Sequence, residues 1–255
     1  MSIPVLIAAR NEANSIGQTL KSLPKDVEPI VLVNDCHDET VDIAQSYGVT
    51  VLERQQAGKV GALQMGLHYL GERAVDPFIT LDADTRPVFP NRWVASLLAG
   101  RQALPAEQPA SVVGLLVFHS NSSALLRTSR LVLHQYLTRT SQQAGSFSGG
   151  NMLIHPRQTS VVQAIGKMPE YWPGEDVAIK DEIVNGGGSV IKTLSVGAVA
   201  LTDGSRMPSL AKTIINGRQH VRDFMRESYL SDAPAGSRPY SSPTEQQLTP
   251  TNIVR

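Results

Sequence analysis

Short apolar runs recur along the chain, separated by segments in which apolar residues alternate with polar ones at helical spacing. Each run is apolar at consecutive positions, so both faces of the strand that it predicts would be buried. The predicted strands lie at residues 5–9, 30–33, 49–52, 78–81 and 111–118. Alternating strands and helices are typical of a parallel sheet with helices on its faces. We therefore expect an α/β fold.

Two of the intervening segments show the helical spacing most clearly. Their apolar positions are Ile16, Leu20 and Leu23 in one segment, and Val60, Leu63, Leu67 and Leu70 in the other. Helix starts favour short polar side chains that accept backbone hydrogen bonds. The candidate caps are Asn14 and Ser15 for the first helix, and Asp38 or Thr40 for a helix after the second strand.

The second half of the chain is less regular. A polar link with two prolines, at 101–110, separates it from a helical pattern at 123–139. Further predicted elements are strands near 152–155, 190–194 and 198–202, and a helix from about Asp176. After Ser231 the chain holds four prolines and scattered serines. We expect residues 231–255 to form a flexible tail.

Composition narrows the classes of function. Lysine plus arginine equals aspartate plus glutamate at 23 each, so no net field favours nucleic acid or an anionic membrane surface. The single cysteine, Cys36, cannot close an internal disulfide, which fits a reducing compartment. Apolar stretches such as 112–118 fall far short of the roughly 20 residues that span a bilayer. We expect a cytoplasmic protein with no transmembrane segment and no nucleic-acid partner.

Two aspartates follow one predicted strand where it ends. In FITLDADTRP, Asp82 and Asp84 come directly after the strand at 78–81, and open α/β sheets bind ligands beyond the carboxyl ends of their strands. Residues i and i+2 of an extended segment project to one side, so two ionised carboxylates would face the same volume. Mg²⁺ or Mn²⁺ carrying phosphate oxygens would relieve their repulsion. The alternative is that both aspartates cap a turn leading into Pro87.

Five segments in order resemble the inverting glycosyltransferases of family two, which have the GT-A fold. These segments are IPVLIAARNEANSI, VLVNDCHDET, AGKVGALQMGL, TLDADTRP and GEDVAIKDEI. The resemblance covers roughly residues 3–224. It implies a Rossmann-like, mostly parallel sheet flanked by helices in a single domain over 1–230, with a nucleotide-binding half at 1–100 and a less regular acceptor-binding half at 111–230. It also implies transfer of a sugar from a nucleotide diphosphate sugar, usually with Mg²⁺ or Mn²⁺.

The resemblance places the donor against the first two loops. It implies that Ala9, Arg10 and Glu12 lie beside the base and ribose, with a salt bridge at a helix start as the alternative for Arg10. Asn34 and Asp35 stand where the family usually has two aspartates that meet the base. One of the pair is an amide here, and the loop NDCHDET is one residue shorter than the commoner form. The base is therefore open: we expect a UDP sugar, with a GDP sugar as the alternative.

A lysine and the two aspartates complete the implied donor site. Lys59 lies in the glycine-rich segment AGKVG, where small residues let a ligand approach the backbone, and its family counterpart lies near the donor. A solvated lysine at a helix start is the alternative. The resemblance implies that Asp82 meets the ribose, that Ala83 lies beside the donor, and that Asp84 holds the metal.

Asp176 is the residue to which the resemblance assigns the chemistry. Inverting transfer needs a base that removes the proton of the acceptor hydroxyl as it attacks the anomeric carbon, and the neighbouring Glu175 would raise the proton affinity of Asp176. The alternative is that both acids stabilise the start of a helix. In QHVRD, Arg222 matches a family arginine and would neutralise the leaving diphosphate. His220 is an additional candidate metal ligand, with a surface histidine as the alternative.

The acceptor site is implied by two further segments. In SFSGGNMLIHP, Gly149 and Gly150 would permit close approach and Asn151 would bond a sugar hydroxyl, whereas a turn before a strand is the alternative. Trp172 would stack on a sugar ring, beside Glu175, whereas core packing is the alternative. The acceptor would be a small molecule, a glycan or a lipid-linked molecule.

The resemblance therefore implies a metal-dependent inverting glycosyltransferase, a hexosyl- or N-acetylhexosaminyltransferase that makes a single transfer. The segment QHVRD lacks the tryptophan found in processive members of the resembled family. Two alternatives are a catalytically inactive protein that binds nucleotide sugars and a sugar nucleotidyltransferase. The second would be expected to carry a glycine-rich phosphate loop near the first strand, where this chain reads AARNEAN.

Overall fold

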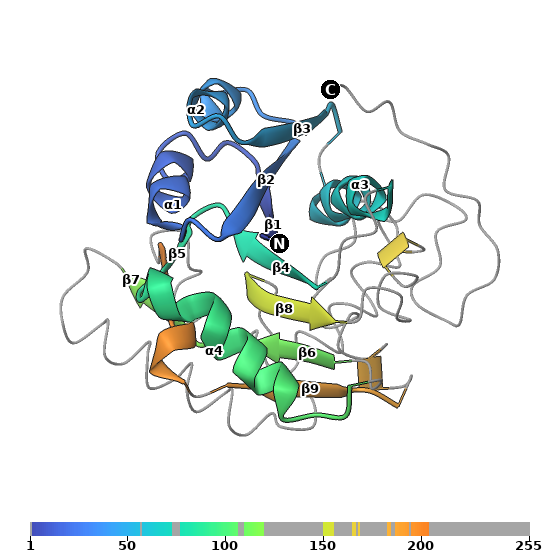
Figure 1. The fold of residues 1–255 in the computed structure, drawn as a ribbon. Coiled ribbons are helices and arrows are strands. Elements are labelled where there is room, and N and C mark those ends of the chain that lie inside the picture. Colours follow the sequence, from blue (N-terminus) through green and yellow to red (C-terminus); the bar gives the residue numbers. More distant parts are fainter. Residues whose placement is uncertain are drawn as a thin grey trace, which may run out of the picture.

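Four parallel, mostly apolar strands form one side of the main sheet (Figure 1). They are β1 (Ile3–Ala9), β2 (Val27–Asn34), β3 (Thr50–Arg54) and β4 (Phe78–Asp82), as the apolar runs predict. The computed structural model describes residues 2–56, 58–72, 77–106, 110–119, 150–155, 165–166, 168, 183–184, 187–193 and 195–203. In this part of the chain the strand order of the main sheet is β3-β2-β1-β4-β8-β6-β9.

Three more strands continue the sheet beyond β4. Strand β8 (Asn151–His155) pairs antiparallel with β4 and with β6 (Ala110–Val113), and β9 (Ser189–Lys192) runs parallel to β6. Of the seven strands of this sheet, β8 is the one that runs against its neighbours. The mostly parallel α/β sheet expected from the sequence is therefore confirmed.

A second sheet of three strands corrects one prediction. It contains β5 (Thr85–Pro87), β10 (Ala200–Asp203) and β7 (Leu116–His119), with β10 in the middle. The single strand predicted at 111–118 is wrong, because the chain leaves the main sheet at Gly114 and enters the second sheet. The Gly114 N–H donates to Asn151 O at 2.9 Å, and a Cβ on Gly114 would lie 2.3 Å from Ala198 O. A glycine inside an apolar run was the available signal for this break.

Helices cover both faces of the main sheet (Figure 1). Helix α3 (Lys59–Glu72) packs on one face, against β1, β2 and β3. On the other face lie α1 (Ile16–Ser22), α2 (Thr40–Ser46) and α4 (Pro90–Gln102), with the short 3-10 helix η1 (Val196–Ala198) beside α4. None of the helices in the described part of the chain is long and apolar enough to cross a membrane.

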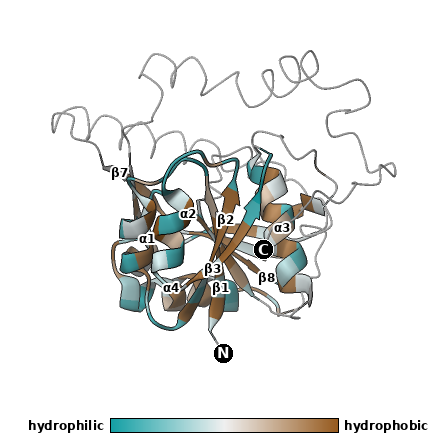
Figure 2. Cartoon of the chain, turned by 90° about the horizontal axis from the view of Figure 1, so that it is seen from above, coloured by the Kyte–Doolittle hydropathy of each residue, from teal (hydrophilic) through white to brown (hydrophobic). Residues whose placement is uncertain are grey.

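Neighbouring residues of one strand belong to two different cores. Leu6 of β1 packs in the cluster that includes Leu63 of α3, whereas Ile7 packs in the cluster that includes Ile16 of α1 and Trp93 of α4. Successive side chains of a strand point to opposite faces, so a strand between two helical layers must be apolar at every position. Figure 2 shows the resulting pattern, with hydrophobic strands between helices that carry hydrophilic residues.

Helix α4 was not identified from the sequence. It starts with Pro90 at a position where the missing N–H costs nothing, and it buries Trp93, Val94 and Leu97. Arg101 in its last turn donates to the carbonyl oxygens of residues 104–106, so it holds the loop that follows the helix. Pro90 and the helical spacing of the apolar residues after it are sequence signals that could have predicted this helix.

The cap residue of α2 is Glu39 and not Asp38 or Thr40, but the Asp38 carboxylate, one residue earlier, bonds the first turn of the helix. This carboxylate accepts the Thr40 N–H at 3.0 Å and the Ala13 N–H at 3.1 Å, so it also holds the loop before α1. Slight burial raises the pKa of Asp38, but the hydrogen bonds from Thr40 and Ala13 outweigh it and lower the pKa below its usual range. Ser15 stands at the start of α1 as expected, although its side chain makes no cap hydrogen bond.

Candidate functional site

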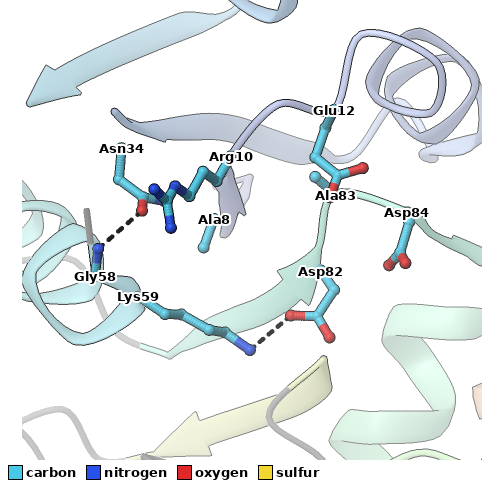
Figure 3. A pocket seen from close by; sticks show the side chains of 9 residues that line it. All are labelled: Ala8, Arg10, Glu12, Asn34, Gly58, Lys59, Asp82, Ala83 and Asp84. Carbon is cyan, nitrogen blue, oxygen red and sulfur yellow. Dashed lines mark hydrogen bonds and ion pairs between the residues drawn. The ribbon is translucent and has the colours of Figure 1, made fainter. Parts of the chain in front are cut away.

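A cavity opens where the strand order of the main sheet reverses. Chain order runs from β1 outward to β3 and then returns to β4 on the other side of β1. In open α/β sheets this switch point is where ligands bind, beyond the carboxyl ends of the strands. The cavity has a volume of about 450 Å³, and Figure 3 shows its lining residues: Ala8, Arg10, Glu12, Asn34, Gly58, Lys59, Asp82, Ala83 and Asp84.

An ion pair spans this cavity. Lys59, the first residue of α3, places Nζ 2.7 Å from Oδ1 of Asp82, the last residue of β4. Both side chains are about one-third exposed, at 34% and 35%. The partial positive charge at a helix start disfavours a lysine there, and a nearby anion offsets that cost for the ammonium group of Lys59. In this structure the anion is the carboxylate of Asp82 (Figure 3).

Asp84 lies on the same cavity but in a different environment. Strand β4 ends at Asp82, and Ala83 and Asp84 form a turn before β5, so the two aspartates meet at the cavity through a turn and not through one extended strand. Burial raises the pKa of Asp84, and the charge of Asp82 raises it further. The hydroxyls of Thr202 and Thr85 oppose that rise by donating to Asp84 Oδ1 at 3.2 Å and 3.3 Å.

The side-chain amide of Asn34 hydrogen-bonds to two loops, one through each of its ends. Its Nδ2 donates to Ala9 O at 3.1 Å, and its Oδ1 accepts the Gly58 N–H at 3.1 Å. A carboxylate could not donate to Ala9 O, which explains why an amide suits this position. Gly58 has φ of +135°, a conformation that side-chain-bearing residues rarely adopt. Asn34 therefore joins the end of β1 to the residue that precedes Lys59.

The first two loops are bonded to each other at the rim of the cavity. Arg10 pairs with Asp35 at 2.9 Å, and His37 Nε2 lies 3.2 Å from the same carboxylate. Asn11 and Asp35 both have positive φ, of 54° and 55°, where non-glycine residues are uncommon. Arg10 does form a salt bridge, but with Asp35 of the next loop and not at a helix start, and it still lines the cavity.

The predicted donor residues divide into two groups. Arg10, Glu12, Asn34, Lys59, Asp82, Ala83 and Asp84 all line the cavity. Asp35 is not among the lining residues, and Ala8 takes the place expected for Ala9. Side chains alternate along β1, so the Ala9 side chain packs in the core with Ile7, while Ala8 borders the cavity.

The two described acceptor candidates have structural partners. A Cβ on Gly150 would lie 2.1 Å from Asp82 Oδ2, so the close approach that this glycine permits is to Asp82. Asn151 is fully buried: its Oδ1 accepts the Trp93 indole N–H at 2.9 Å, and its Nδ2 donates to Ala198 O at 2.9 Å. The expectation of a sugar contact for the Asn151 side chain is therefore corrected, because both ends of its amide are engaged inside the protein.

Six predicted site residues lie outside the described residues. They are Gly149, Trp172, Glu175, Asp176, His220 and Arg222. Their roles stay predictions.

Sequence reasoning missed three residues next to the site. Thr85 follows Asp84 directly, so its proximity could have been inferred from the chain alone. Thr202 had no such signal, because it reaches Asp84 only through the pairing of β10 with β5. Arg54 was also missed: it is 4% exposed and donates to Gly58 O at 3.1 Å, so it supports the loop that carries Lys59.

The chemistry of the cavity fits a hard divalent cation. Mg²⁺ binds one or two carboxylates together with phosphate oxygens and does not need a cage of protein ligands. Asp84 would supply one carboxylate, which its partly buried position leaves without full hydration, and Asp82 would supply another, which is paired with Lys59. Among the described residues no group of three or more His, Cys, Asp or Glu side chains could hold a metal by itself. The site therefore suits a metal that arrives with a phosphorylated ligand.

Comparisons with known proteins agree with this geometry. A model of glycosyl transferase family 2 matches residues 5–151. Glucosyl-3-phosphoglycerate synthase from Mycobacterium tuberculosis, in complex with Mn²⁺, UDP and phosphoglyceric acid, matches with a TM-score of 0.55 and 22% identity over 86% of this chain and 76% of that one. The complex of that synthase with Mn²⁺ and UDP-glucose matches with a TM-score of 0.55 and 20% identity, over 86% of this chain and 76% of that one. No curated protein matches the chain.

The fold and the cavity define an α/β protein of the GT-A type, with acids and a lysine at the switch point of its sheet. The family match covers more than half of the 255 residues. The chain belongs to glycosyl transferase family 2 and is a glycosyltransferase.

Proposed function

We propose that the protein is a metal-dependent inverting glycosyltransferase that moves a sugar from a nucleotide diphosphate sugar, preferably a UDP sugar, to a hydroxyl acceptor in a single transfer. The observation that carries this proposal is the gathering of Lys59, Asp82 and Asp84 around one cavity at the switch point of a family 2 fold. Its volume of about 450 Å³ lies within the range of small-molecule sites, roughly 300–1,000 Å³.

The lining residues suggest how the donor would lie. The first loop contributes Arg10 and Glu12 to the lining of the cavity, and β4 with the turn after it contributes Asp82 and Asp84 (Figure 3). The base and ribose would bind beside Arg10 and Glu12. A divalent cation held at Asp84 supplies positive charge to the leaving diphosphate when it is bound. Lys59 adds a positive charge from the protein itself, 2.7 Å from Asp82.

The base and the leaving-group cation come from the resemblance. Asp176 would take the proton from the acceptor hydroxyl while the hydroxyl oxygen bonds to the anomeric carbon. The bond from that carbon to the diphosphate breaks on the opposite side, so configuration inverts, and the nucleoside diphosphate leaves with the electron pair. Arg222 would stabilise the charge of the departing diphosphate. Both residues lie outside the described residues.

The ligands named for the similar solved structures support the donor class and the metal. Those structures hold Mn²⁺ with UDP or UDP-glucose, and one holds phosphoglyceric acid as well. At 22% identity the likeness shows the fold alone, so phosphoglyceric acid is one acceptor to test beside glycan and lipid-linked acceptors. The cytoplasmic location predicted from Cys36 stays a prediction.

A thermal-shift screen tests the donor and the metal together. UDP, GDP and dTDP sugars are added to the protein with and without Mn²⁺, because a ligand that binds the folded state stabilises it by mass action. We expect the largest shift from a UDP sugar, and only when Mn²⁺ is present. A shift of equal size without the metal would contradict metal dependence.

Substitution of the proposed base separates an enzyme from an inactive binder. Asp176→Asn should abolish release of UDP from the donor while the ligand-induced thermal shift survives. Asp26→Asn, which changes an exposed carboxylate in the turn before β2, is the matched control and should keep the wild-type rate. If the wild-type protein and both variants bind the donor and none turns it over, the inactive binder is the correct function. Formation of pyrophosphate from a nucleoside triphosphate and a sugar phosphate would instead identify a nucleotidyltransferase.

A further inference from the structure

Two buried threonines converge on one oxygen of Asp84. Thr85 Oγ1 and Thr202 Oγ1 both donate to Asp84 Oδ1, at 3.3 Å and 3.2 Å, and neither of these two hydroxyls bonds the second oxygen, Oδ2. Thr85 is fully buried and Thr202 is 6% exposed. Two protein hydroxyls on a single carboxylate oxygen restrict how the carboxylate can turn.

The second sheet brings these hydroxyls together. Thr85 of β5 and Thr202 of β10 are direct partners in the antiparallel register of the two strands. Directly opposed residues of an antiparallel pair place their side chains on the same face of a sheet, close to each other. Strand β10 is held from its other side by β7, where Thr202 pairs with Phe118. Thr202 is therefore placed by a paired central strand, although it lies 118 residues beyond Asp84.

Thr202 lies outside the part of the chain that the family model matches. The family model matches residues 5–151, so Thr202 lies beyond the matched region. No motif in the sequence singles it out, and it does not line the cavity. A role in the site must therefore act through Asp84.

Orientation of a carboxylate matters for metal affinity. The terminal torsion of an aspartate has a broad energy profile, so an unsupported carboxylate samples many orientations. Hydrogen bonds from neighbouring groups hold a metal-binding carboxylate in the orientation that the metal needs, and their loss typically costs 10–100-fold in affinity. With Oδ1 held by two hydroxyls, the Asp84 carboxylate is fixed relative to the cavity that it lines.

We propose that Thr202 is a positioning residue that orients the Asp84 carboxylate for the divalent cation, so that the second sheet sets the metal affinity of the donor site. This inference rests on the proposed function, since it assumes that Asp84 holds the metal. It assigns to β10 a role that the two acids after β4 do not reveal by themselves.

The test measures the Mn²⁺ concentration at half-saturation in the presence of excess UDP, by calorimetry and by thermal shift. Thr202→Val removes the hydroxyl and keeps the shape, and Thr202→Ser keeps the hydroxyl. We expect Thr202→Val to raise the half-saturating Mn²⁺ concentration by about tenfold or more. Thr202→Ser should stay within about threefold of the wild type, since its hydroxyl can still donate.

A control variant removes a different buried hydroxyl. Ser111 Oγ is buried and has no hydrogen-bond partner in the described structure, so Ser111→Ala deletes a hydroxyl that orients nothing. It should leave the half-saturating Mn²⁺ concentration unchanged. If Thr202→Val does not fold, Thr202→Ala is compared with Thr202→Ser in the same way, because the two differ mainly in the hydroxyl.

The outcomes distinguish this inference from the proposed function. A wild-type protein that binds UDP without any response to Mn²⁺ overturns both. A wild-type protein that responds to Mn²⁺, with Thr202→Val or Thr202→Ala equal to it, overturns only the role of Thr202. A variant with a lower metal-free melting temperature and an unchanged half-saturating concentration shows a merely structural threonine and also overturns the inference.

Discussion

Gly150 provides the sharpest test of how the site is built. A Cβ at this position would lie 2.1 Å from Asp82 Oδ2, so the carboxylate would have to retreat by about 1.3 Å to reach the 3.4 Å at which ordinary contact begins. The Lys59 ion pair, 2.7 Å long at the other oxygen, would be disturbed by the same movement. Misplacement of a site group by about 1 Å can cost roughly a hundredfold in rate. We expect Gly150→Ala to lower the turnover of the donor by about this factor.

The assay is release of UDP from a UDP sugar with saturating Mn²⁺, measured beside the melting temperature. Gly71→Ala is the control, because a Cβ there meets nothing within 4 Å and Gly71 lies in α3. Replacing a glycine in a compatible conformation should stabilise the protein by about 0.4–1 kcal/mol and leave turnover unchanged. A Gly150→Ala protein that keeps at least one-third of the wild-type rate would refute the reasoning, since Asp82 would then tolerate displacement.

Two further predictions concern charge and pH. Burial and the charge of Asp82 raise the pKa of Asp84, so the ionised carboxylate destabilises the metal-free fold. Asp84→Asn should therefore have a higher melting temperature than the wild type at pH 7 without metal. It should also lose the Mn²⁺-dependent thermal shift. The gain in melting temperature should shrink as the pH falls toward 3.8, the ordinary pKa of an aspartate. An Asp84→Asn protein that melts lower than the wild type at pH 7 would contradict this prediction. Asp38 has a lowered pKa, so its stabilisation is present above pH 3.8 and is lost as the pH falls through its folded-state pKa. Asp38→Ala should cost about 1 kcal/mol at neutral pH, measured by denaturant unfolding, and much less in acid; an equal loss at both pH values would show that the charge is irrelevant.

Local pattern was sufficient for much of residues 1–100. Strands buried on both faces are recognisable because most of their positions are apolar, and β1 to β4 lie where the predicted apolar runs occur. The acids of DADTRP were located correctly for the same reason: a polar pair directly after a buried strand must lie at the end of the sheet, where β4 delivers Asp82. These features depend on residues that are neighbours in the chain.

Individual side-chain roles were less predictable. Asn151 was expected to contact a sugar, but its amide is buried between Trp93 of α4 and Ala198 of η1, two elements that pattern alone did not bring together. The expected strand at 111–118 divides at Gly114 because the backbone of residue 151 and the carbonyl of residue 198 approach that glycine. Neither neighbour is close to Gly114 in the sequence.

The sequence by itself determined the α/β class, the positions of the first four strands along the chain and the presence of two acids at the end of the fourth. Only the tertiary structure decided that Lys59 neutralises Asp82 and that Thr202 bonds Asp84. The physical reason is that a buried strand or helix needs apolar residues at regular positions in the sequence. A hydrogen bond between distant residues depends instead on strand register and helix docking. Those contacts are set when the whole sheet forms, and they distinguish the two aspartates of the site.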